Sequence, residues 1–458
     1  MMEYLLVAGV LTVAALFGLS FFLKIKVIPI LIMGAVIVCG INPGVYNVGK
    51  SIYQNSTSKF NEYWNGFETN AYASPMTCTK DGSCRNTYDC DPYLVPVTHT
   101  QTVSDGKGGT TTQTYTVMET HYHSCPYSTE ETSYYVDSTI ETFTIARSVM
   151  TGPEFRPYER SIPGGRQGAP QSWTEAKARI DSGNPGPVTV VKPYQNYILA
   201  SQDEFFEKYS DKIETLKEKG LLPTPAQGVY QTYQADKAYR VSNVKLAPDA
   251  FIKFKNDVSY LNGAVGNDLQ GDLHVVFVPS DVEAGKDDYL NALMAYWQSE
   301  ELKRNAISKN SIVVVLGISK DGTKVDWAKA ETGMPVGNES LFTAISSGLK
   351  DAPVDETLLG HPTYNVGSDA IVHSEGKLET ILWGENGFDR VSMTANEEDD
   401  NGTGFEYLLA GMNPEGWPLF FIGFVNVILA AGLMVLCSWL IISREVMPSL
   451  SRWGNSSY

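Results

Sequence analysis

The sequence predicts an α+β/α/β ectodomain, a mixed sheet with covering helices, with a β-rich disulfide-stapled insert and apolar anchors at both ends. Three observations support this prediction. Trp417–Ser443 contains no charged residue, and two β-branched runs flank a helical segment after residue 272. A set of cysteines follows residue 76. The predicted order is an N-terminal transmembrane hairpin (1–42), a connector (43–75), a β-rich disulfide-stapled region (76–150), a Pro/Gly-rich linker (151–200), the α/β ectodomain (201–416), a transmembrane helix (417–443) and a cytoplasmic tail (444–458).

The C-terminal apolar run has the length and composition of a membrane span. A helix rises about 1.5 Å per residue, and crossing the hydrocarbon core of a bilayer takes roughly 20 apolar residues. Trp417 and Trp439 lie near the two ends, where an indole suits the membrane interface, and Arg444 follows. A buried core helix is the alternative, but soluble helices seldom run this long without a charge. We therefore predict a transmembrane helix.

Two further apolar runs, Tyr4–Leu23 and Val27–Ile41, are separated by Lys24 and Lys26. A signal peptide would begin with basic residues, whereas Glu3 stands there, so a helical hairpin is the simpler interpretation. Positive charge marks the cytoplasmic side, which favours three spans; two spans are the alternative. Both versions predict a multi-pass membrane protein whose body lies in the periplasm or the extracellular space.

Contacts between the spans are predicted where small or polar residues recur at helical spacing. Ala14 and Gly18 lie on one face of the first run, and Asn426 and Ala430 on one face of the last. Small residues allow helices to approach closely, and an amide in hydrocarbon needs a hydrogen-bond partner. The alternative for Asn426 is a bond to its own backbone or to a lipid headgroup.

Cys78, Cys84, Cys90 and Cys125 form an even set in the predicted exported region. Such a set indicates disulfides, here with three possible connectivities. Zinc, with His121 and His123 as further ligands, is the rival, but the cysteine gaps are wider than the C-x2–4-C spacing of structural zinc sites. Between the cysteines, alternating runs at 95–103 and 110–117 joined by a glycine-rich turn predict a β-hairpin.

The net charge of −17 argues against a nucleic-acid partner, because phosphates would be repelled. It suits a solvated domain, with solubility as the simplest reason and binding of cations or basic surfaces as the alternative.

The segment from residue 272 onwards alternates strands and helices. Its predicted elements are the strand Leu273–Pro279, a helix over Lys286–Asn305, the strand Ser311–Ile318, a strand over Lys324–Ala330 and a helix over Asn338–Leu349. Continuous β-branched runs are typical of strands that helices cover on both faces. His274, inside the first strand, is predicted to be a packed core residue. Short apolar pieces such as Leu378–Trp383 are interpreted as strands.

This order resembles the TPM-domain family over residues 272–350, about 80 of the 458 residues. The likeness is carried by Trp297 on a helix, the strand entry Asn310–Val315, Lys324 on the hairpin strand and Glu331-Thr332-Gly333 at a turn. Ser311 stands where the family usually has glycine, and Lys324 where it often has arginine. The resemblance implies an α/β domain associated with phosphatase activity, divalent-cation binding or assembly roles in membrane complexes.

Asp281, Glu283, Asp287 and Asp288 follow the first buried strand, at the sheet edge where α/β proteins place ligands. Hard carboxylate oxygens there would suit Ca²⁺. The alternative, which we favour, is a solvated loop whose acidic groups stabilise a helix N-terminus.

The sequence shows none of the common catalytic motifs. It therefore favours a non-enzymatic, membrane-anchored extracytoplasmic protein that binds or scaffolds partners of a membrane-associated complex. Its expected partners are membrane lipid and either other proteins or further copies of itself, and no cofactor is expected beyond the candidate Ca²⁺. The alternative function is a divalent-metal-dependent phosphatase of the TPM-like type.

Overall fold

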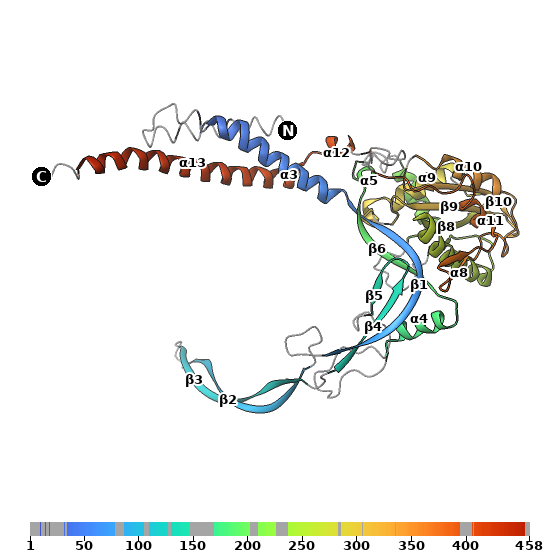
Figure 1. The fold of residues 1–458 in the computed structure, drawn as a ribbon, viewed down its shortest axis with the longest axis horizontal. Coiled ribbons are helices and arrows are strands. Elements are labelled where there is room, and N and C mark those ends of the chain that lie inside the picture. The colour runs from blue at the N-terminus through green and yellow to red at the C-terminus, as the bar shows by residue number, and fades with distance from the viewer. Residues whose placement is uncertain are drawn as a thin grey trace.

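The structure, a computed structural model, describes residues 10, 14, 18, 32, 34–77, 87–104, 110–126, 130–145, 169–201, 209–225, 237–282, 285–304, 306–334, 336–393, 405 and 407–453. These residues form a mixed α/β protein with several sheets and one apolar C-terminal helix (Figure 1).

The body is built on a four-stranded sheet in the order β10-β9-β8-β7. Strands β7 (Ala238–Arg240) and β9 (Ser311–Ile318) run parallel to β8 (Asp272–Pro279), and β10 (Val325–Thr332) is antiparallel to β9. The predicted strands at 273–279 and 311–318 are therefore confirmed.

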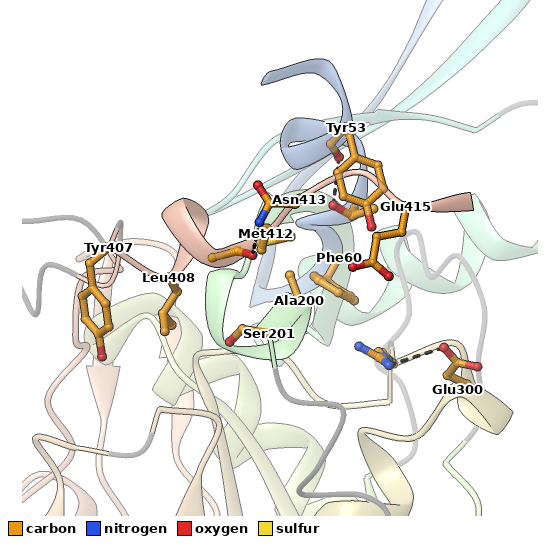
Figure 2. A pocket seen from close by; sticks show the side chains of 13 residues that line it. Tyr53, Phe60, Ala200, Ser201, Glu300, Tyr407, Leu408, Met412, Asn413 and Glu415 are labelled. Carbon is orange, nitrogen blue, oxygen red and sulfur yellow. Dashed lines mark hydrogen bonds and ion pairs between the residues drawn. The ribbon is translucent and has the colours of Figure 1, made fainter. Parts of the chain in front are cut away.

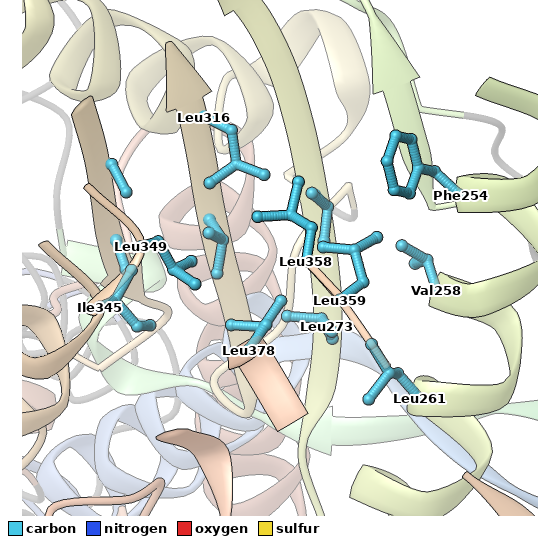
Figure 3. Close-up of a cluster of buried hydrophobic side chains, with 14 of the residues drawn as sticks. Phe254, Val258, Leu261, Leu273, Leu316, Ile345, Leu349, Leu358, Leu359 and Leu378 are labelled. Carbon is cyan, nitrogen blue, oxygen red and sulfur yellow. The ribbon is translucent and has the colours of Figure 1, made fainter. Parts of the chain in front are cut away.

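Helices cover both faces of this sheet. On one face lie α8 (Pro248–Ala264), α10 (Glu339–Gly348) and α11 (Lys377–Leu382), and on the other lie α7 (Ser210–Glu218) and α9 (Lys286–Trp297). Figure 3 shows the first face, where Leu273 and Leu316 pack against Phe254, Leu261 and Ile345. Because side chains alternate along a strand, the next residues point to the second face. The same strands therefore contribute to two hydrophobic cores, one on each face of the sheet.

A second sheet, in the order β5-β4-β1-β6, extends away from the body. Its longest strand is β1 (Lys59–Thr77), which pairs antiparallel with β6 (Pro187–Gln195) and then, beyond a register shift after Glu68, with β4 (Glu130–Ser138). Strand β5 (Thr142–Thr144) pairs with β4. Helix α4 (Gln171–Asp181) packs on this sheet. The predicted connector thus contributes the central strand β1, and the predicted linker contributes helix α4 and the edge strand β6.

The predicted hairpin is confirmed as a two-stranded sheet of β2 (Thr87–Ser104) and β3 (Thr110–Pro126), which we call the ribbon. Figure 1 shows the ribbon projecting away from the body. Cys78 and Cys84 lie outside the described residues. Cys90 and Cys125 lie on the paired strands, opposite His123 and Tyr88, but their side chains are not among those described. The disulfides therefore stay a prediction.

The apolar helix α13 (Gly416–Trp453) lies antiparallel along α3 (Asn42–Thr57) and the π-helix η1 (Ile37–Ile41) that precedes it (Figure 1). Among the described residues only Gly416–Leu436 is long and apolar enough to cross a membrane. The multi-pass prediction is corrected accordingly, because the described residues contain one candidate span. The placement of the body in the periplasm or extracellular space depends on additional spans and is withdrawn with it. Most of Tyr4–Leu23 lies outside the described residues.

The predicted contact residues of the helices differ in environment. Ala14 is exposed, and a Cβ at Gly18 would meet nothing within 4 Å, so no close approach is seen there within the described part of the chain. Asn426 and Ala430 are buried on α13, and no described group bonds the buried Asn426 Oδ1.

The remaining elements are short. One prediction among them is wrong, because Leu378–Trp383 is mostly the helix α11 rather than a strand. The others are α5 (Tyr197–Ser201), η3 (Val265–Leu269), η4 (Glu300–Leu302), β11 (Thr363–Asn365), β12 (Ala370–Val372) and α12 (Tyr407–Gly411).

Candidate functional site

The three described carboxylates of the candidate Ca²⁺ site each pair with a different lysine. Asp281 pairs with Lys320 at 3.1 Å, Asp287 with Lys329 at 2.8 Å, and Asp288 with Lys212 at 2.6 Å, while Glu283 lies outside the described residues. The hydrogen bonds to Lys320 and Lys329 lower the pKa values of Asp281 and Asp287. Within the described ranges no three metal-binding side chains converge.

The landmark residues of the TPM resemblance have structural roles. The Trp297 indole is buried and donates a hydrogen bond of 2.8 Å to the Pro223 carbonyl oxygen. Lys324 forms an exposed ion pair with Asp351 at 2.7 Å. Gly333 allows a close approach, because a Cβ there would lie 1.9 Å from the Ser308 carbonyl oxygen.

The most unusual polar feature is a buried ionic network around Asp272, the first residue of β8. One carboxylate oxygen accepts hydrogen bonds from Lys237 and, at 2.9 Å, from Asn65 Nδ2. The other oxygen lies 2.9 Å from His274 Nε2 and 3.2 Å from Ser311 Oγ. The side chains of Lys237, Asp272 and His274 are at most 2% exposed, so the network is shielded from water.

Burial and pairing set the protonation of this network. Burial alone would raise the pKa of Asp272, but the charge of Lys237 and the bond with His274 hold it well below its ordinary value. Burial lowers the pKa of His274 despite the nearby carboxylate. The tautomer that fits donates from Nε2 to Asp272 and accepts at Nδ1 from the Tyr239 hydroxyl at 3.2 Å. We infer an ionised Asp272–Lys237 pair beside a neutral imidazole.

These pKa values predict that acid destabilises the protein in two ranges. The folded pKa of His274 is lowered from 6.5, so unfolding binds a proton and stability falls as the pH drops below 6.5. The folded pKa of Asp272 is also lowered, from 3.8, so protonation of this carboxyl removes further stability below pH 3.8. We expect the urea midpoint of the full chain in mild detergent to decrease in both ranges. In the His274→Gln variant, the decrease of the urea midpoint just below pH 6.5 should be smaller. An unchanged dependence of the midpoint on pH would contradict the role assigned to His274.

The network joins the long strand β1 to the body. Asn65, in β1, also accepts a hydrogen bond of 2.7 Å from Thr189 Oγ1 of β6. Asn310 Nδ2 donates to the Tyr63 carbonyl oxygen at 3.2 Å. The contact lies at the amino ends of β7, β8 and β9, whereas α/β sheets bind ligands at the carboxyl ends. We therefore interpret it as a structural joint.

Two histidines on the body are oriented by buried carboxylates. His361 Nδ1 lies 2.9 Å from Asp257 Oδ1, and His373 Nδ1 lies 2.9 Å from Glu379 Oε1. The carboxylates are at most 4% exposed, whereas the imidazoles are 36% and 43% exposed. Such pairing is typical of histidines that bind metals or accept protons. No third ligand joins them within the described residues. The sequence analysis missed the first pair because Asp257 lies 104 positions from His361; the second pair, only six positions apart, matches no common site motif.

A pocket of about 850 Å³, the junction pocket, lies where α3 and α13 meet the body. Figure 2 shows Tyr53 from α3, Phe60 from β1 and Ser201 from α5 on its wall, with Glu300 and Glu415 at its rim. Arg304 donates to the Leu199 carbonyl oxygen at 2.8 Å and pairs with Glu300 at 3.4 Å. The pocket thus combines polar and apolar groups beside the candidate membrane span.

Comparisons of the chain with protein-family models, with curated proteins and with solved structures find no match. The resemblance to the TPM-domain family therefore stays a prediction that depends on its short motifs.

Proposed function

We propose that this chain is a membrane-anchored binding or scaffolding protein that holds a protein partner on its ribbon. The observation that carries the proposal is one apolar face of the ribbon. The pairs Val97 with Val117, and His99 with Tyr115, place alternate residues on this face. We call it the ribbon face; it comprises Tyr93, Val95, Val97, Tyr115 and Val117.

The ribbon face is exposed to an extent that calls for a covering partner. Tyr93, Tyr115 and Val117 are 43%, 47% and 42% exposed. Among the described strands, β2 and β3 pair only with each other. A two-stranded sheet is marginally stable alone in water, and its open edges invite a further strand. A partner could bury the exposed apolar side chains by covering the face, or could pair with an open strand edge by extending the sheet.

Both faces of the ribbon carry exposed apolar side chains, and the two faces differ in how these side chains are arranged. The ribbon face carries Glu119, which accepts a hydrogen bond from His99 at 2.8 Å and lies 3.8 Å from His121. On the opposite face the exposed apolar side chains Leu94 and Met118 lie towards one end, and cross-strand threonine pairs such as Thr98 with Thr116 continue that face. The Val97–Val117 pair thus lies between Glu119 on one side and His99 on the other, and protein interfaces commonly place polar groups around an apolar contact.

The anchor and the joint explain why such a ribbon would work as a scaffold. The candidate span would fix the chain to a membrane, while the buried network around Asp272 fixes β1 to the body. Because β1 pairs with β4, close to the ribbon in the chain, the ribbon is presented from a stable base. The phosphatase alternative gains no support, since three of its four carboxylates pair with separate lysines.

The test is recovery of a partner after mild detergent extraction of the full chain. We expect Val117→Glu, which places a charge on the ribbon face, to reduce recovered partner at least ~10-fold, equivalent to about 1.4 kcal/mol of binding free energy. Thr116→Glu adds the same charge to the opposite face and should leave recovery within about twofold. Recovery of the unmodified chain alone, as a monomer, would contradict the proposal.

A further inference from the structure

An apolar groove of about 570 Å³ runs between α3 and α13, beside the candidate span. Its walls come from Val45 and Val48 on α3 and from Phe421, Val425 and Leu429 on α13. All of these side chains are aliphatic or aromatic, and they lie at the depth where Gly416–Leu436 would be in hydrocarbon. An apolar ligand from the bilayer therefore suits the groove.

Two glycines of α3 shape this groove. A Cβ at Gly49 would lie 2.5 Å from Ile422 Cγ1, so this glycine lets α3 and α13 approach closely. Gly44 also lines the groove, but a Cβ there would meet nothing within 4 Å. The helices thus touch at Gly49 and leave open space at Gly44.

Tyr53 lines both the groove and the junction pocket, so the two hollows adjoin at this residue. Figure 2 shows Tyr53 beside Glu415 and Asn413, at the polar end. A single ligand that follows both hollows would be apolar at one end and polar at the other. A second helix would match the groove but not the polar pocket, whereas a membrane lipid matches both.

The charges of the junction pocket select among lipid headgroups. Two glutamates, Glu300 and Glu415, line the pocket. Arg304 pairs with Glu300 and donates to the Leu199 carbonyl oxygen, so the charge of Arg304 offsets that of Glu300. Glu415 makes no hydrogen bond or ion pair with the described side chains around it and is exposed. Lys50 donates to Asn413 Oδ1 at 3.0 Å near Glu415, so this end offers a carboxylate for an ammonium group and a cation for a phosphate, which suits a zwitterionic headgroup better than a purely anionic one.

We propose that the groove and the junction pocket together bind one phospholipid with an amine-bearing headgroup. Its acyl chain lies in the groove between α3 and α13, and its ammonium group lies near Glu415. Both hollows have volumes within the ~300–1,000 Å³ typical of small-molecule sites. The proposal rests on membrane anchoring, which is part of the proposed function, but not on a protein partner for the ribbon.

The test uses the full chain in nanodiscs and a phosphatidylethanolamine whose acyl chain carries a photoreactive diazirine. Light should attach the probe to peptides that contain residues 44–53 and 418–429. Gly44→Phe fills the open space in the groove and should reduce labelling of these peptides at least ~5-fold. Gly432→Phe is the matched control: a Cβ there also meets nothing within 4 Å, but Gly432 does not line the groove. It should leave labelling unchanged.

A second measurement tests the headgroup. Unlabelled phosphatidylethanolamine should compete with the probe better than phosphatidylglycerol, and Glu415→Gln should reduce this difference. Labelling spread evenly over α13, or reduced equally by both glycine variants, would overturn the acyl-chain site. Equal competition by both lipids would overturn the headgroup assignment. Loss of ribbon partner binding, measured separately, would leave these results unaffected, so the two proposals fail independently.

Discussion

Asp272→Ala is expected to lower the free energy of unfolding by about 3–5 kcal/mol, because it leaves Lys237 buried without its counter-charge. Lys237 is 3% exposed, and its ammonium group lies 4.3 Å from the centre of the Tyr63 ring. This cation–π contact compensates for little of the lost ion pair with Asp272. The substitution also removes the acceptor of Asn65 and so weakens the contact between β1 and the body.

Urea titration of the full chain in mild detergent, followed by pulse proteolysis, would measure this loss. Asp281→Ala is the control, because it breaks an exposed ion pair and should change the midpoint little. Adding Lys237→Met to Asp272→Ala removes the stranded charge and should recover part of the stability. A single variant as stable as the unmodified protein would show that the network is not a buried ionic joint.

The body was predictable from sequence because its signals are local. The runs Leu273–Pro279 and Ser311–Ile318 are apolar except for His274 and Ser311, and the structure buries both faces of these strands. The hairpin was equally visible, since alternating threonine and valine residues flank a glycine-rich turn. The short piece Leu378–Trp383 was misassigned because an apolar run of this length fits a strand or a buried helix equally well.

The joint and the sites depend on residues that meet only in the folded chain. Asn65 reaches Asp272 across 207 positions, so β1, which is rich in asparagine and tyrosine, gave no sign of docking on the body. The pairing of the acidic cluster was hidden for the same reason: Lys212, Lys320 and Lys329 come from three separate segments and divide its carboxylates. The local clue to the joint was the placement of Asp272 and His274 in an otherwise apolar strand.

Trp297→Ala is the second substitution with a large expected effect. Trp297 is fully buried at the end of α9, and its ring lies 5.2 Å from that of Tyr239 and 5.4 Å from that of His274. Removing a buried indole costs about 3–5 kcal/mol through lost burial and the cavity left behind. Trp297→Phe keeps most of the ring and loses the hydrogen bond to Pro223, so it should cost about 1 kcal/mol plus a small packing loss.

The two substitutions should not act independently, because His274 contacts both Asp272 and Trp297. The cavity left by Trp297→Ala would let the imidazole move and admit water, which would lessen the desolvation of the network. We therefore expect the double variant to lose about 0.5–3 kcal/mol less than the sum of the single losses. The same urea titration on all four proteins measures this coupling. Strict additivity would mean that the core under α9 and the joint around Asp272 are separate structures, which their shared histidine argues against.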